Sequence, residues 1–327
     1  MKSIICVVPW CAVALGVGCS ASGGGSFAGA DAGPSPGETD ADIKQATDPA
    51  ALPSAFWLVN ATSNLFDVRV CLFDGEPAVP SENTIPSTNF PGLTTGQAAR
   101  VRANRGDSFT PKLYEAKRVA ALEVTGAVDC ATLSTLLPSI PLAAVTLPQS
   151  PSVLALTGCP ANTTGDTSAC GADYAVGTGN LRITEVPVAA SYDRNHPVGV
   201  QVLDLSRSVA AVKNLRWGLG SLAKGACATD SIVSAAVPFA TAMPTTAISR
   251  EEITDFDASG LALCDADSAT PILAASFTSQ QSATNPAAIP AEHFAQRGNY
   301  VFTVVGQKGG TGTSALRVLA LPFTLTM

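Results

Sequence analysis

The cysteines of this chain constrain its fold more than any other feature. There are nine, and Cys6, Cys11 and Cys19 lie in or directly after an apolar N-terminal run. The other six are typical of three disulfides in an exported protein, because disulfides persist in oxidising compartments. None of the six forms a C-x-x-C pair, which argues against zinc and thiol-redox chemistry. The sequence therefore predicts an exported, disulfide-bonded protein without a cofactor.

The N-terminus has the form of an export signal. Lys2 supplies a positive start, and residues 4–18 form an uncharged run of 15 residues. A membrane-spanning helix needs about 20 residues, and Pro9 would interrupt one, so a permanent span is the weaker alternative. We expect residues 1–18 to be a signal peptide.

The segment L-G-V-G-C-S, residues 15–20, resembles the bacterial lipobox, in which small residues precede a cysteine that becomes lipidated. The resemblance implies a lipid on Cys19 and, with Ser20 behind it, an outer-membrane location. Gly16 stands where that motif usually has leucine. Ordinary cleavage downstream, for instance after Ala21, is the alternative.

Residues 19–50 are expected to form a disordered tether. They are rich in Gly, Ala, Ser, Pro and acidic residues, and such segments cannot bury enough apolar surface to offset their ordering entropy. Without residues 1–18 the chain has 18 basic and 26 acidic residues, a formal charge of −8. An acidic surface repels nucleic acid, so we expect no nucleic-acid partner.

From residue 55 onward the chain consists of short apolar runs that are rich in β-branched residues and broken by Pro, Gly, Asn and Asp, a pattern typical of strands and turns. The predicted strands are residues 56–60, 67–73, 98–103, 110–115, 119–124, 152–156, 181–186, 198–203, 214–219, 300–305 and 316–325. Short helices are expected only at residues 131–137, 249–256 and 291–296.

An internal repeat divides this region. V-L-A-L-T-G at residues 153–158 matches V-F-T-V-V-G at 301–306, and L-R-I-T-E-V-P at 181–187 matches L-R-V-L-A-L-P at 316–322. Val59-Asn60-Ala61 is aligned more weakly with Val202-Leu203-Asp204. Between the two good matches the first half is 13 residues longer, and the extra segment holds Cys159 and Cys170, which indicates a stapled hairpin loop. We expect a mainly β fold of two tandem antiparallel β-sandwich modules, Ig-like or transthyretin-like, at residues 51–190 and 191–327.

The motifs F-W-L-V-N-A-T-S at residues 56–63, D-V-R-V-C at 67–71 and R-G-D-S-F at 105–109 before K-L-Y-E-A at 112–116 resemble the DUF4397 family of exported bacterial proteins. The resemblance implies a lipoprotein with two such modules, of a type familiar from myxobacteria. Asn64 and Arg105 depart from the prolines of the family pattern. That family has no established activity, so the resemblance implies architecture and location only.

The six cysteines beyond Cys19 allow fifteen pairings. We predict Cys71 with Cys130, Cys159 with Cys170, and Cys227 with Cys264. The preference rests on module boundaries, since each pair then lies inside one module, and on proximity in the sequence.

Candidate catalytic and metal sites are few. His196 and His293 are the only histidines, and no G-x-S-x-G elbow accompanies them. Asp255, Asp257 and Ser259 match the first half of a calcium loop, but Ala266 stands where the loop needs a bidentate Glu. The glycine-rich residues 307–313 lack the Gly-Lys-Ser/Thr order of a P-loop, and we expect a hairpin turn there.

These features favour a cell-envelope lipoprotein of a Gram-negative bacterium that acts as a binding or structural surface module. The expected partners are the membrane, through the lipid, and an envelope protein or polysaccharide. A secreted or surface hydrolase with an active site assembled from distant residues is the alternative. A calcium-stabilised spacer is a third interpretation.

Overall fold

The structure is a computed structural model in which residues 48–327 form one compact unit. It describes residues 56–62, 65–74, 79–80, 84–86, 92–101, 103, 106–126, 128–164, 167–188, 198–206, 215–221, 232–235, 239–240, 246–248, 259–265, 271–276, 281–282, 298–310 and 315–323. The predicted signal peptide, the predicted tether and the helices expected at residues 249–256 and 291–296 lie outside the described residues.

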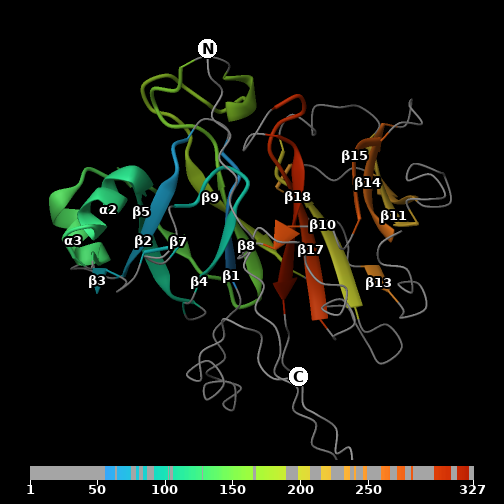
Figure 1. The fold of residues 1–327 in the computed structure, drawn as a ribbon, viewed down its shortest axis with the longest axis horizontal. Helices are drawn as coiled ribbons and strands as arrows, with labels where there is room; N and C mark the ends of the chain where they lie inside the picture. Colours follow the sequence, from blue (N-terminus) through green and yellow to red (C-terminus); the bar gives the residue numbers. More distant parts are fainter. Residues whose placement is uncertain are drawn as a thin grey trace, which may run out of the picture. The chain divides into compact units, whose positions relative to one another are not determined.

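The described strands belong to four sheets (Figure 1). Sheet A has the order β4 (Ala98–Val101), β1 (Phe56–Asn60), β8 (Ser152–Thr157), β9 (Arg182–Pro187). Sheet B has the order β3 (Val79–Pro80), β2 (Val68–Asp74), β5 (Ser108–Glu115), β6 (Ile140–Pro141), with β7 (Val145–Thr146) also on β5. Sheet C has the order β13 (Thr246–Ile248), β10 (Val198–Asp204), β17 (Gly298–Val305), β18 (Arg317–Phe323), β16 (Gln281–Ser282). Sheet D has the order β12 (Ile232–Ala235), β11 (Leu215–Ser221), β14 (Ser259–Asp265), β15 (Pro271–Ser276).

The expected mainly β class is confirmed, but the sheets are not wholly antiparallel. β1 pairs in parallel with β8, and β10 pairs in parallel with β17. β4 and β9 flank the first parallel pair in antiparallel register, just as β13 and β18 flank the second. Four strands of sheet C, β13, β10, β17 and β18, therefore repeat the order of the four strands of sheet A, and β16 is added beside β18. The motifs aligned by the internal repeat occupy equivalent strands.

The hydrogen bonds shift the weaker alignment of the repeat, that of residues 59–61 with 202–204, by one residue. Asn60 stands opposite Leu156 on β8, and Asp204 stands opposite Val304 on β17. The next residue in each case donates its backbone N–H to that partner's carbonyl oxygen at 2.9 Å. Asn60 is thus equivalent to Asp204, whereas the sequence alignment placed it against Leu203.

Sheet A is buried on both faces, because alternate side chains of β1 enter different hydrophobic clusters. Trp57 and Val59 pack in a cluster that also contains Leu203, Leu205 and other residues of sheet C. Phe56 and Leu58 pack in a second cluster with residues of sheet B. We call the two predicted modules, 51–190 and 191–327, the first and second halves. The first cluster contains residues from both halves, and we call this cluster the shared core. The module boundary itself stays a prediction.

Two short helices cover the face of sheet B that does not contact sheet A (Figure 1). α2 spans Ala116–Glu123 and α3 spans Cys130–Leu136. Asp129 is the N-cap of α3, and its side chain accepts a hydrogen bond from the Thr132 amide. Val119 and Leu133 pack with Phe73 and Tyr114. A disulfide between Cys71 on β2 and Cys130 on α3, with a Cα–Cα distance of 5.7 Å, links helix to sheet.

The strand expected at residues 119–124 was a wrong prediction, since residues 119–123 are helical. The segment A-K-R-V-A-A-L-E consists almost wholly of strong helix formers, with Val119 its only β-branched residue. Its apolar face is buried by sheet B. The helix expected at residues 131–137 is confirmed as α3, one residue earlier.

Candidate functional site

The loop that joins β8 to β9 lies at the surface and is held by a disulfide and by side-chain hydrogen bonds. It runs over residues 158–181 between two antiparallel strands, except that residues 165–166 lie outside the described residues. We call it the stapled loop. It holds the extra residues of the first half, and a one-turn helix, η1 (Ser168–Cys170), ends at its second cysteine. Figure 1 shows it projecting beyond the end of sheet A, in green.

A disulfide closes the loop near its base. Cys159 and Cys170 are fully buried and bonded to each other, with a Cα–Cα distance of 5.2 Å. The bridge is one of the two pairings expected in the first half, and Cys71–Cys130 is the other. It ties the middle of the loop, at Cys170, back to the start of the loop, at Cys159.

Asn180 joins the two arms through hydrogen bonds at both ends of its amide. Its Oδ1 accepts from the Cys159 backbone N–H at 2.8 Å. Its Nδ2 donates to the Cys170 carbonyl oxygen at 2.9 Å and to Asp173 Oδ1 at 2.8 Å. Its backbone N–H donates to the Cys159 carbonyl oxygen at 3.0 Å. One side chain therefore stabilises the closed shape of the whole loop.

Gly158 permits this close approach. Its φ is +86°, and a Cβ at this position would lie 2.3 Å from the Asn180 carbonyl oxygen. Only glycine adopts this conformation with so little space. Any residue with a side chain at position 158 would therefore have to move the opposite arm of the loop.

An ion pair closes the exposed side of the base. Arg182, the first residue of β9, donates from Nη1 to Asp173 Oδ2. This hydrogen bond is the main reason that the pKa of Asp173 lies below its usual value. Both side chains are nearly half exposed, so solvent screening limits the contribution of the pair to stability.

The outward side of the loop carries small, mostly uncharged side chains. Val176 is 80% exposed, and Asn162, Thr164, Ala175 and Thr178 are exposed as well. The segment 158–181 contains no His, Lys, Arg or Glu. The segment presents hydroxyl, amide and apolar groups to solvent.

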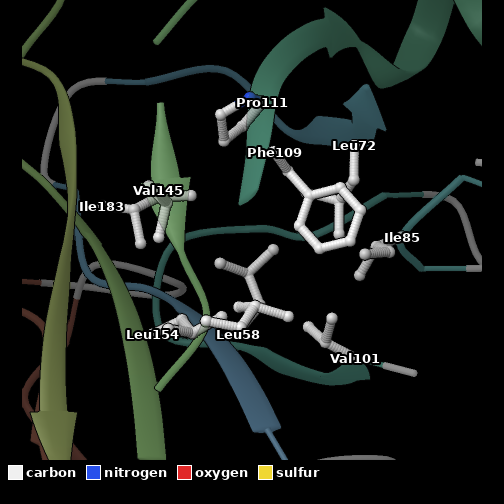
Figure 2. A pocket seen from close by; sticks show the side chains of 10 residues that line it. Leu58, Leu72, Ile85, Val101, Phe109, Pro111, Val145, Leu154 and Ile183 are labelled. Carbon is white, nitrogen blue, oxygen red and sulfur yellow. The ribbon is translucent and has the colours of Figure 1, made fainter. Parts of the chain in front are cut away.

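A small void lies between sheets A and B, and Figure 2 shows it. Its volume is about 10 Å³, and only apolar residues line it, including Leu58, Phe109 and Leu154. A buried water needs polar partners, and a ligand needs a pocket of several hundred Å³. The void is a gap in packing and is too small for a ligand.

A buried charge in the first half has a structural explanation. Arg69 on β2 is 1% exposed, and its Nη1 donates to the Pro86 carbonyl oxygen at 2.6 Å and to Thr84 Oγ1 at 3.2 Å. Its Nη2 lies 3.4 Å from Glu123 Oε2 on α2. Burial lowers the pKa of Arg69, and the charge of Glu123 opposes this. The guanidinium thus connects β2 to α2 inside the fold.

Most of the other predicted site residues fall outside the described residues. These are Cys19, Cys227, His196, His293, Asp255 and Asp257, whereas Ser259 is the first residue of β14. Cys264 on β14 is buried and disulfide-bonded, and its partner also lies outside. Within the described ranges, no three His, Cys, Asp or Glu residues are grouped as a metal site would require.

The glycine-rich segment at residues 307–313 follows β17 directly, and β18 returns antiparallel to it. The Gly310 backbone N–H donates to the Gln307 carbonyl oxygen at 2.9 Å. The expected hairpin turn is confirmed as far as residue 310, and residues 311–314 lie outside the described part of the chain.

Sheets, helices and bridges together define a disulfide-bonded, mainly β protein of the kind found in oxidising compartments. Of the helices within the described ranges, none is long and apolar enough to cross a membrane.

Comparisons with known proteins identify no family for the chain. No protein-family model matches it, and a search of curated proteins finds no relative. One solved structure that it is similar to is described as a "putative adhesin" from Bacteroides ovatus, with 10% identity, 84% of this chain and 98% of that chain covered, and a TM-score of 0.17. At that TM-score neither fold nor role can be transferred.

Proposed function

We propose that the chain is a non-catalytic surface module of a Gram-negative cell envelope, anchored by a lipid on Cys19, and that it binds an envelope protein or polysaccharide through the stapled loop. The observation that carries the proposal is the separation of roles within this loop. Buried cysteines, Asn180 and Gly158 hold its shape, while residues such as Val176 face outward.

An ordered loop binds a partner more tightly than an unordered loop of the same sequence. A flexible loop loses conformational entropy when a partner holds it, typically about 0.5 to 1.5 kcal/mol per immobilised side chain. The disulfide and the hydrogen bonds of Asn180 restrict the loop before a partner arrives. The two bridges of the first half also support export, because such bonds persist in oxidising compartments.

The anchor is supported by the lipobox resemblance around Cys19 and by the Gly- and Ser-rich segment behind it. The resemblance to the DUF4397 family supports the same location. Metabolic labelling with a fatty acid tests the anchor: we expect label on the wild-type protein and none on Cys19→Ala. An unlabelled wild-type protein that starts near Ser22 would show ordinary cleavage instead.

Site-specific photo-crosslinking in intact cells tests the loop. A photoreactive residue at position 176 is compared with one at position 124, since Val176 and Val124 are both exposed valines and Val124 follows α2, away from the loop in sequence. We expect a defined adduct from position 176 and none from position 124. Sensitivity of the adduct to protease or to glycosidase identifies a protein or a polysaccharide partner.

Removing the staple provides the matched control. The double variant Cys159→Ser, Cys170→Ser keeps the outward residues of the loop but not its closure. We expect the adduct at position 176 to fall at least about tenfold, as a loss of about 1.4 kcal/mol in binding free energy implies. Equal adducts from positions 176 and 124, or an adduct unaffected by loss of the bridge, would contradict the proposal.

A further inference from the structure

The turns that follow β1 and β10 are equivalent, but one has an amide where the other has a carboxyl group. Asn60 and Asp204 each end their strand, and both are buried, at 0% and 1% exposure. Each accepts, through Oδ1, a hydrogen bond from the backbone N–H two residues later, Thr62 at 3.1 Å and Ser206 at 2.8 Å. The backbones are also held alike, since Gly96 and Ala240 donate to the Asn60 and Asp204 carbonyl oxygens.

The amide of Asn60 acts as both acceptor and donor. Besides accepting from the Thr62 amide and hydroxyl groups, it donates from Nδ2 to the Leu93 carbonyl oxygen at 2.9 Å. This donated bond joins the end of β1 to the chain segment before β4. An ionised carboxyl group has acceptors only, whereas a protonated one has an O–H donor. At the equivalent position, Asp204 can take over the donor role of Asn60 only in its protonated form.

The described strands around Asp204 favour the neutral form of its side chain. Its flanking strands, β13 and β17, carry no Asp, Glu, Lys, Arg or His. Tyr300 is the titratable residue of β17, and burial raises its pKa to about 12, so it is neutral. Arg317 is on β18, with β17 between it and β10, and its Nη2 donates to the Thr95 carbonyl oxygen. Ser206 directs its hydroxyl group to the Gly306 carbonyl oxygen.

Burial raises the pKa of Asp204 to about 7, and the hydrogen bond from the Ser206 amide opposes the shift. In the unfolded chain the same group has an ordinary pKa near 3.8.

We propose that Asp204 is a proton-controlled switch in the second half: its protonated side chain stabilises the turn after β10, and loss of the proton weakens the attachment of that turn to the shared core. The next residue, Leu205, is 2% exposed and packs in the shared core with residues from both halves. Ionisation of Asp204 therefore acts where β10 ends and this core begins.

The sign of the effect follows from proton linkage. Between pH 3.8 and about 7 the folded chain keeps a proton on Asp204 that the unfolded chain has lost. Stability from this group is therefore largest below pH 3.8, falls as the pH rises through this window, and is constant above it. One proton changes the unfolding equilibrium constant by up to about tenfold per pH unit.

Denaturant unfolding of the exported protein between pH 4 and 8, in parallel with Asp204→Asn, tests the switch. Asparagine keeps the shape and the donor but does not titrate. We expect the unfolding constant of the wild type to rise relative to that of the variant by up to about tenfold per pH unit until about pH 7. Coincident pH profiles for the two proteins would overturn the proposal.

Two further measurements keep the test decisive even if Asp204→Asn folds poorly. Asn60→Asp is the mirror variant, and it should add a pH dependence of the same sign. The infrared band of a protonated carboxyl group should be present in the wild type at pH 6 and decrease as the pH rises through 7. Absence of that band at pH 6, or an Asn60→Asp protein that gains no pH dependence, would also overturn it.

Discussion

At the scale of single residues, the stapled loop depends on Asn180 more than on any residue it exposes. Asn180→Ala removes three side-chain hydrogen bonds, and we expect the loop to lose about 1 to 3 kcal/mol of local stability. Amide hydrogen exchange at Cys159 measures this directly, because its N–H is bonded to Asn180. Asn162→Ala, an exposed asparagine of the same loop, should leave the exchange unchanged. Equal effects of the two variants would contradict the role of Asn180.

Two glycines of the loop allow the cost of backbone strain to be measured separately from the cost of a steric clash. Gly158 and Gly177 have φ values of +86° and +91°, but a Cβ would meet the Asn180 carbonyl oxygen at Gly158 and nothing within 4 Å at Gly177. Alanine at either site costs about 1 to 3 kcal/mol for its backbone conformation. At Gly158 the clash should add about 1 to 3 kcal/mol. Thermal unfolding measures the stabilities of the two alanine variants. Equal stabilities would contradict the added cost of the clash at position 158.

The residue patterns of the sequence predicted the cysteine pairs of the first half. They did not predict the side-chain hydrogen bonds of Asn180 and Arg69. Cys159 and Cys170 are close in sequence and lie in one insertion, so their pairing follows from proximity. Asn180 and Cys159 are 21 residues apart, and no local motif connects them. Arg69 lies among apolar strand residues, and its burial depends on Thr84, Pro86 and Glu123, which are distant along the chain.

At the scale of elements, the two bridges of the first half should differ in their effect on stability. Cys71–Cys130 spans 59 residues and Cys159–Cys170 spans 11. Longer loops lose more entropy in the unfolded chain when they are closed. Chain-entropy arguments give about 4 kcal/mol for the first bridge and about 3 kcal/mol for the second. Denaturant unfolding of the two Cys→Ser double variants measures the difference, and a larger loss from the shorter bridge would contradict it.

Strands with short, bounded apolar runs were predictable, and β1 was predicted with its observed limits. α2 was missed because its valine and leucine suggested a strand, whereas the helix period of its apolar face became clear only against sheet B. The burial of both faces of β1 is visible in F-W-L-V-N, which has no polar alternation. That pattern indicates a strand between two layers, but it does not say which layers these are.

At the scale of the whole molecule, the shared core should couple the stabilities of the two halves. Leu205 of the second half packs in the cluster that contains Trp57 of the first. We expect Leu205→Ala to cost about 2 to 5 kcal/mol and to lower the unfolding temperature of both halves together. Calorimetry, with hydrogen exchange reporting on each half, measures this. A variant in which only the second half loses stability would show that the halves unfold independently.

The order of the strands in the sheets could not be predicted from the sequence patterns. A parallel pair needs a long crossover connection, and β1 is separated from β8 by the whole of sheet B and both helices. Periodicity identifies strands but not their partners, so the first expectation was antiparallel sandwiches. The internal repeat predicted equivalent strands in the two halves, and sheets A and C have equivalent orders because the same crossover occurs twice.

The stapled loop divides its residues between those that hold its shape and those that face solvent, and these two sets barely overlap. Substitutions at positions such as 162, 164, 176 and 178 therefore change what the loop presents at little cost to folding, since these side chains are exposed. At the cell surface that we propose for this protein, such an arrangement would permit antigenic variation on a constant scaffold. The same property makes position 176 a natural site at which to insert a foreign peptide for display.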